Sequence, residues 1–114
     1  MASPLIETRN ITRILPLQIP VTLVRNISMV VHEGEFISVT GPSGSGKSSL
    51  LYLLGLLDRP TEGCVLVDGQ DTTDMSENEL CALRLCRLGF VFQFHFLLFQ
   101  FTVLENVMVP MHKL

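Results

Sequence analysis

The sequence has 114 residues, which is enough for one small domain with a hydrophobic core. Hydrophobic residues make up 47% of it and charged residues 17%, which indicates either an unusually complete core or a surface that another molecule covers. The net charge of −3 argues against nucleic acid as a partner, because binding a phosphate backbone requires a basic face.

Membrane-spanning segments and a signal peptide are not expected. The longest uninterrupted apolar run, Leu50–Leu57, is far shorter than the roughly 20 residues that a spanning helix needs. The first ten residues show no basic start followed by an apolar run. Cys64, Cys81 and Cys86 fit a reducing compartment and are expected to act as small buried hydrophobes.

The first third of the chain predicts strands. Leu5–Ile11 and Val21–Val31 are rich in β-branched residues, and a loop with two prolines joins them. Residues 33–35 predict a turn. The short apolar run Phe36–Thr40 predicts a strand buried on both faces.

The middle of the chain predicts a helix, a strand and a second helix. Lys47–Leu56 has apolar positions nearly all round, which predicts a buried helix. Cys64–Val67 predicts a strand that ends in Asp68-Gly69, a hairpin-type turn pair. Ser76 and Glu79 have the spacing of a capping box, which predicts a helix to about residue 85.

The last third predicts a short strand and a capped helix. Phe90–Phe92 predicts the strand. Thr102 and Glu105 form a second capping box, and the helix that they start should close at Pro110. Strands and helices alternate from residue 36 onward, so the predicted fold class is α/β with an added antiparallel layer from the first third.

Residues 41–48, GPSGSGKS, match the phosphate-binding P-loop pattern G-x-x-x-x-G-K-[ST] between the predicted strand and helix. Phosphate oxygens need several backbone N–H donors that converge, and glycines allow that close approach. Lys47 is expected on the β- and γ-phosphates of ATP, and the Ser48 hydroxyl on Mg²⁺. The expected phosphate-contacting residues are Gly41, Pro42, Ser43, Gly44, Ser45, Gly46, Lys47, Ser48 and Ser49. The loop alone does not choose among kinases, GTPases and transport ATPases.

Three segments resemble the ATP-binding cassette (ABC) family. GPSGSGKSSLL at 41–51 is similar to the family's Walker A segment, and LLGLLDRPTEGCVLVDGQD at 53–71 to the stretch that follows it. LGFVFQFHFLLFQFTVLENVMVP at 88–110 resembles the Q-loop region, and is most similar to the lipoprotein-releasing and macrolide-efflux exporter branch. The resemblance runs from about residue 22 to the end.

The resemblance implies an ABC-type P-loop core sheet with an N-terminal antiparallel β layer, truncated at the start of the helical subdomain. Residues 1–35 would form the β layer, 36–92 the P-loop core, and 93–114 the Q-loop and the start of the helical subdomain. The full protein would couple ATP binding and hydrolysis to export or lipoprotein release from the cytoplasmic, inner face of the cell membrane. Its implied partners are a transmembrane permease subunit and a second nucleotide-binding subunit.

The resemblance also implies roles beyond the P-loop. Gln93 would be the Q-loop glutamine, which contacts Mg²⁺ or the attacking water. The implied docking surface for the permease is the aromatic run after it: Phe94, His95, Phe96, Phe99 and Phe101. The alternative, that these rings fill the local core, stays open. His32 and His112 are expected at the surface.

The sequence departs from the family pattern in several places. Residues 13–17 hold no aromatic ring where the family stacks one on adenine, so Ile14 or Leu15 would offer only apolar contact. Phe99 stands where a proline is common. The family's signature motif, Walker B aspartate, catalytic glutamate and switch histidine lie beyond the Q-loop, and no apolar run ending in Asp-Glu occurs here. No catalytic residue is therefore expected within these residues, and the chain alone should not turn over ATP.

Two functional readings remain at this point. In the first, the chain is part of the ATPase subunit of an exporter. In the second, it is a non-hydrolytic nucleotide-binding module. A soluble kinase or GTPase is disfavoured, because neither an acceptor-binding lid nor the base-reading N-K-x-D is present.

Overall fold

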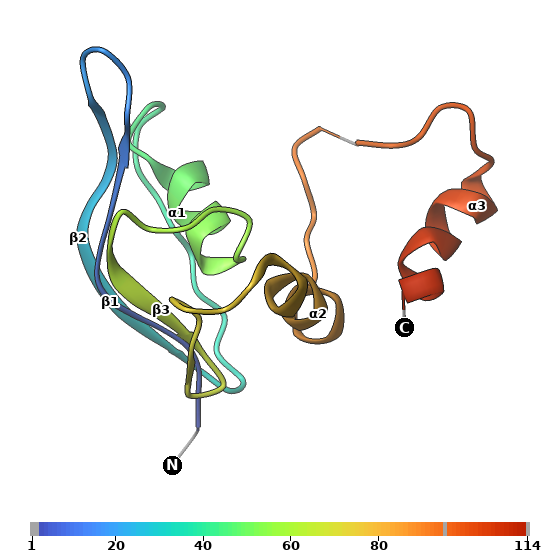
Figure 1. The fold of residues 1–114 in the computed structure, drawn as a ribbon, viewed down its shortest axis with the longest axis horizontal. Coiled ribbons are helices and arrows are strands. Elements are labelled where there is room, and N and C mark those ends of the chain that lie inside the picture. Colours follow the sequence, from blue (N-terminus) through green and yellow to red (C-terminus); the bar gives the residue numbers. More distant parts are fainter. Residues whose placement is uncertain (1–2, 95, 114) are drawn as a thin grey trace. The chain divides into compact units, whose positions relative to one another are not determined.

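The computed structural model describes residues 3–94 and 96–113. The chain forms two compact units, one ending at Ser76 and the other beginning at Glu77, and each is described by itself (Figure 1). Within the described residues, no helix combines the length and the apolar character needed to cross a bilayer.

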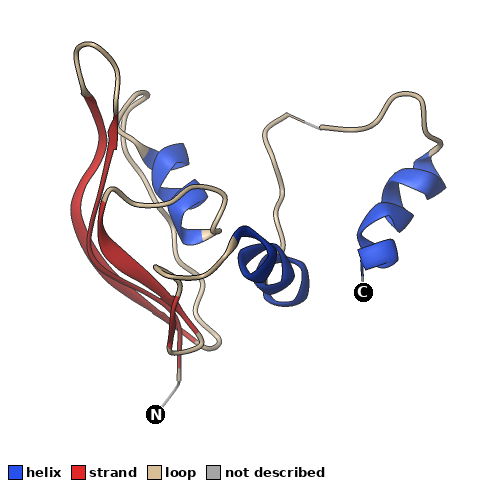
Figure 2. Cartoon of the chain, in the orientation of Figure 1, coloured by secondary structure: helices blue, strands red, loops and turns tan. Residues whose placement is uncertain are grey.

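The first unit is built on a four-stranded antiparallel sheet (Figure 2). Its strands are β1 (Pro4–Leu15), β2 (Val21–His32), β3 (Glu62–Val67) and β4 (Gln70–Asp71), in the order β2-β1-β3-β4. The strands predicted at Leu5–Ile11 and Val21–Val31 are confirmed, and β1 extends beyond its predicted end to the loop with the two prolines.

Two buried threonines hold β1 and β2 together where their register shifts. The Thr8 hydroxyl accepts a hydrogen bond from the Met29 N–H (3.0 Å) and donates one to the Ile27 carbonyl (3.1 Å). The Thr12 hydroxyl accepts from the Asn26 N–H (2.9 Å). Asn26 itself has a positive φ of 49°. The hydroxyls therefore replace ladder hydrogen bonds that the irregular pairing would otherwise leave unmade.

The core lies where α1 (Lys47–Leu54) packs on the sheet. Ile11 from β1, Leu53 from α1 and Val65 from β3 are at most 1% exposed. The helix was expected to be buried nearly all round, and this is wrong: Leu51 is 52% exposed and Tyr52 44%. Only one side of α1 packs on this sheet. The hydrophobic periodicity of the helix could not identify that side, because both sides of the helix carry apolar residues.

The β3–β4 connection confirms the predicted hairpin turn. Asp68 and Gly69 both have positive φ, 51° and 80°, as a type I′ turn requires. Beyond β4, the Thr72 hydroxyl donates to the Val65 carbonyl at 2.8 Å and ties the chain back to β3.

Two predicted strands are not formed. Residues 36–40 run as a loop between β2 and α1 (Figure 2), with Phe36 97% and Ile37 41% exposed. Phe90–Phe92 is likewise irregular, and Val91 is fully exposed. A strand buried on both faces needs a hydrogen-bonded neighbour, and no described residue pairs with either segment.

The second unit contains α2 (Glu77–Arg87), α3 (Val103–Met108) and the 3₁₀ helix η1 (Val109–Lys113). The start of α2 directly after Ser76 agrees with the predicted N-terminus. Acidic residues in the first turn of α2 and basic residues in its last turn complement the helix dipole.

The predicted capping box at α3 is confirmed. The Thr102 hydroxyl accepts the Glu105 N–H at 3.1 Å, and the Glu105 carboxylate accepts the Thr102 N–H at 3.0 Å. The hydrogen bonds from the backbone and side chain of Thr102 lower the pKa of Glu105. α3 ends at Met108, and Pro110 lies in the 3₁₀ turn that follows.

Gly63→Ala should destabilise the first unit strongly. Gly63 has φ +78°, and a Cβ there would overlap the carbonyl oxygens of Arg9 and Asn10 on β1. Backbone strain and overpacking together predict a loss of roughly 2–6 kcal/mol in the free energy of unfolding, measured by denaturant titration. Gly69→Ala is the matched control, because Gly69 has φ +80° and open space around it; it should cost about 1–2 kcal/mol. Equal losses in the two variants would contradict the close packing of β3 on β1.

Candidate phosphate-binding site

The glycine-rich loop leads directly into α1. Residues 41–46 form the loop, and the helix begins at Lys47, as the P-loop pattern predicts. A hydrogen bond from the Ser45 N–H to the Pro42 carbonyl (3.1 Å) closes a turn within the loop. The predicted order of loop and helix is therefore present, although the segment before the loop is not a strand.

Gly46 is the tightest point of the loop. It caps α1 with φ +98°, a left-handed conformation, and a Cβ on it would overlap the carbonyl oxygen of Leu23 on β2. Glycine is required here because the loop backbone lies against the backbone of β2. Gly44 also has a positive φ, +81°, but has open space around it.

The start of α1 offers backbone donors. No side chain caps the helix, and its first hydrogen bond runs from the Leu50 N–H to the Gly46 carbonyl at 2.9 Å. The N–H groups of a first helical turn have no partner within the helix, and the helix dipole adds positive potential there. This arrangement suits an anion at the end of the loop.

Lys47 lies back over the loop that precedes it. Its ammonium donates to the carbonyl oxygens of Gly41 and of Pro42, the latter at 2.9 Å. An ammonium has three donors, so these two contacts leave one for a ligand oxygen. Lys47 thus stabilises the loop through these hydrogen bonds and provides a positive charge beside it.

The two serines after Lys47 lie on the first turn of α1. Ser48 is exposed and Ser49 half-buried. A serine hydroxyl is a hard oxygen ligand of the type that Mg²⁺ accepts together with water and phosphate oxygens. The chemistry of Ser48 therefore fits the predicted metal contact.

A cavity of about 390 Å³ borders the loop within the first unit. β2 contributes Thr22, Leu23 and Arg25 to its lining, and the loop and α1 contribute Ser45 and Lys47. The start of β2 is therefore the neighbour of the loop in this unit. Leu23 was missed in the sequence analysis, since no local pattern links it to a loop so far along the chain.

Gln93 and the aromatic run belong to the second unit. Gln93 is exposed in the irregular segment after α2. Phe94 and Phe96 are each 68% exposed, Phe99 95% and Phe101 41%. His95 lies outside the described residues. The roles given to these residues remain predictions.

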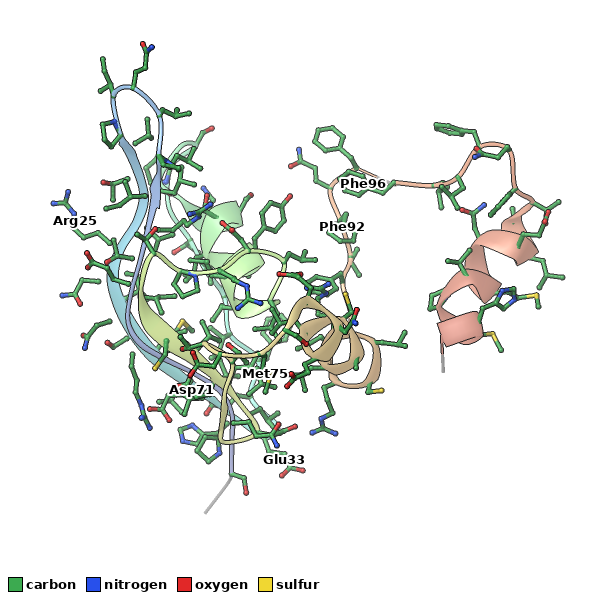
Figure 3. All side chains as sticks on the ribbon, viewed as in Figure 1. Arg25, Glu33, Asp71, Met75, Phe92 and Phe96 are labelled. Atoms are coloured by element: carbon green, nitrogen blue, oxygen red, sulfur yellow. The ribbon has the colours of Figure 1, made fainter. Side chains whose placement is uncertain are left out.

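Some rings of this segment contact one another. Phe90 stacks on Phe92 with centroids 5.5 Å apart, and Phe92 meets Phe96 edge to face at 5.0 Å (Figure 3). Phe96 has a positive φ of 52°. Phe94 and Phe99 lie outside any core formed by the described residues, at 68% and 95% exposed, and the alternative that the rings fill a local core remains untested for the complete protein.

Comparison with known proteins identifies the family of the chain. The family model described as ABC transporter matches residues 24–113. The chain belongs to the ABC transporter family. The predicted resemblance is confirmed, and so is the predicted α/β fold class with its antiparallel layer, because a solved ABC cassette superposes on nearly the whole chain.

That cassette is MJ0796, solved as a dimer in a post-hydrolysis state bound to ADP and Pi. The TM-score is 0.90 at 39% sequence identity, covering 95% of this chain and 47% of MJ0796. The lipoprotein-releasing system ATP-binding protein LolD of Aquifex aeolicus is 55% identical over 92 residues, 81% of this chain and 41% of LolD. LolD of Anaeromyxobacter dehalogenans is 46% identical over 97% of this chain and 47% of its own length. The chain thus spans less than half the length of these relatives.

Gly46→Ala should weaken the binding of Mg-ATP at least tenfold, about 1.4 kcal/mol, because the new Cβ pushes the loop away from Leu23. Isothermal titration of the full chain measures the effect. Gly34→Ala is the control: Gly34 also has a positive φ, +81°, with nothing near its Cβ position, and the variant should bind within about twofold of the unaltered chain. Undiminished binding by Gly46→Ala would show that the loop does not depend on this contact.

Proposed function

We propose that the chain is the phosphate-binding part of the ATP-binding subunit of an ABC exporter, which couples ATP binding and hydrolysis to export or lipoprotein release across a membrane. The observation that carries the proposal is the P-loop, seated against β2 through Gly46 and braced by Lys47. The similarity to lipoprotein-releasing ATP-binding proteins supports the transport class.

The loop and the first turn of α1 bind the phosphates of ATP in this proposal. Backbone N–H groups from Gly44 to Ser49 donate to phosphate oxygens, and the remaining donor of Lys47 contacts the β- and γ-phosphates. The carbonyl oxygens of Gly41 and Pro42 accept hydrogen bonds from the Lys47 ammonium. These two residues therefore contribute to phosphate binding by positioning Lys47.

The Ser48 hydroxyl would hold Mg²⁺ beside the phosphate loop of the first unit, and the role proposed for Gln93 is to contact Mg²⁺ or the attacking water through its amide oxygen. When bound, the ion neutralises charge on the β- and γ-phosphate oxygens. Both side chains offer neutral oxygen donors of the kind that leave several positions for water and phosphate. Gln93, exposed in an irregular segment, also senses whether the γ-phosphate is present.

The exposed rings of the second unit dock a transmembrane permease subunit. Phe94, Phe96, Phe99 and Phe101 form this surface, and the apolar area of the four phenylalanines supports it. His95, which is also predicted to belong to it, lies outside the described residues. The protein acts as a pair with a second nucleotide-binding subunit, on the cytoplasmic face of the cell membrane. Residues 1–35, 36–92 and 93–114 serve as β layer, P-loop core and Q-loop segment.

The second candidate is a non-hydrolytic nucleotide-binding module. Phosphate binding by the loop is common to both candidates, and turnover separates them.

Lys47→Ala should abolish measurable Mg-ATP binding. The variant removes the charged donor, and hydrogen bonds to charged groups contribute about 1.5–3 kcal/mol each. It also releases the carbonyl oxygens of Gly41 and Pro42 and so loosens the loop. Equilibrium titration with fluorescent and unlabelled ATP measures it. Lys113→Ala removes the same charge at the only other lysine of the sequence and serves as the control. Equal affinities of the two variants for Mg-ATP would contradict the P-loop assignment.

The 114-residue chain should show no steady-state ATPase activity, because residues 1–114 contain no identified base to activate water. The measurement is phosphate release at saturating Mg-ATP, with Lys47→Ala as background. Release above that background would overturn this expectation and would locate a base within these residues.

A further inference from the structure

Asn106 on α3 connects this helix to the loop that precedes it. Its amide oxygen accepts the Leu98 N–H at 2.9 Å, and its amide nitrogen donates to the Leu98 carbonyl at 3.2 Å. The same nitrogen donates to the Thr102 carbonyl at 2.9 Å. A backbone N–H only donates and a carbonyl only accepts, so one orientation of the amide satisfies all three contacts. One side chain therefore holds both ends of the loop 98–102.

The loop closes in a turn between these two ends. The Phe101 N–H donates to the Leu98 carbonyl at 3.0 Å, and the Asn106 amide nitrogen lies 3.4 Å from the Phe101 carbonyl. Asn106 is half-buried, whereas its neighbours Glu105 and Val107 are exposed. The Asn106 side chain thus lies against the turn, in the loop that Figure 1 shows leading into α3.

Two of the exposed rings belong to this turn. Phe99 is 95% exposed and Phe101 41%. A side chain as exposed as that of Phe99 has few packing contacts to hold it, so the backbone of the turn sets where the ring lies. That backbone is outside the helix, and the Asn106 amide is hydrogen-bonded on both sides of it.

We infer that Asn106 is a positioning residue of the docking surface, which holds the turn 98–102 so that Phe99 and Phe101 are presented to the permease subunit in one arrangement. The inference rests on the proposed function, which assigns these rings to that surface. It adds a residue that acts through the two rings. A ring that is held in place before binding avoids an ordering cost equivalent to roughly 2- to 13-fold in affinity per side chain.

Hydrogen exchange of single amides in the full chain tests the positioning. Asn106→Ala should speed exchange of the Leu98 N–H about threefold to tenfold, because this N–H loses its acceptor. The Glu105 N–H, bonded to the Thr102 hydroxyl, is the internal control and should change less than about twofold. Alanine favours helix more than asparagine does, so α3 should stay formed.

Unchanged exchange at Leu98 would overturn the inference. Equal acceleration at Leu98 and Glu105 would overturn it too, because Asn106 would then support the helix as a whole and not the turn. Neither of these results bears on the proposed function.

Binding of the full chain to membranes tests the consequence for docking. The probe is vesicles of the organism's own cell membrane, stripped of peripheral proteins, before and after protease digestion. The unaltered chain should bind the undigested vesicles and lose binding after digestion. Phe99→Ala and Asn106→Ala should each weaken this binding at least about threefold. The double variant should lose less than the product of the two single losses, because Asn106 acts through the ring.

The outcomes separate the inference from the proposed function. Weakened binding by Phe99→Ala with full binding by Asn106→Ala overturns the inference and leaves the docking surface in place. Losses that multiply in the double variant also overturn it, because the two residues would then act independently. Absence of protease-sensitive binding by the unaltered chain overturns both the docking surface and the role of Asn106 in it.

Discussion

The close approach of Gly46 to the carbonyl of Leu23 is the contact on which the site depends. It joins a loop that would otherwise be a free connection to the longest hairpin of the sheet, so the start of α1 is held at one end of β2. Only a residue without a Cβ permits this distance, and the left-handed φ of Gly46 turns the chain from loop into helix at the same point. One residue thereby sets both the position and the direction of the helix N-terminus.

The rest of the first unit supports that contact from two sides. Buried hydroxyls of Thr8 and Thr12 hold β2 to β1 across irregular register, so β2 presents a defined edge to the loop. On the other side, Lys47 donates to the carbonyls of Gly41 and Pro42, and the loop closes on itself. The shape that we propose for anion binding is therefore formed in the absence of an anion, which would reduce the ordering cost of binding.

Local features were predictable because their causes lie within a few residues. The Asp68-Gly69 turn needs two residues that accept positive φ, and the capping box at Thr102 and Glu105 needs two side chains three positions apart. Phe36–Thr40 and Phe90–Phe92 have the composition of buried strands, yet composition supplies no hydrogen-bonded neighbour. Both segments are irregular in the structure. The partial exposure of α1 could not be predicted for a related reason, because a helix that is apolar on nearly all sides gives no sign of which side packs on the sheet.

The sequence by itself determined the chemistry of the phosphate loop: its glycines, the cation of Lys47 and the hydroxyl of Ser48 are fixed in order and spacing, and these set which ligand atoms it suits. Only the tertiary structure decided which strand the loop rests on, where the lysine donates its hydrogen bonds, and which side chains stand beside the site. The physical reason is the separation along the chain of the residues that interact. Backbone conformation and capping are settled by neighbouring residues, whereas the contact of Gly46 with Leu23 joins parts of the chain that only packing brings together.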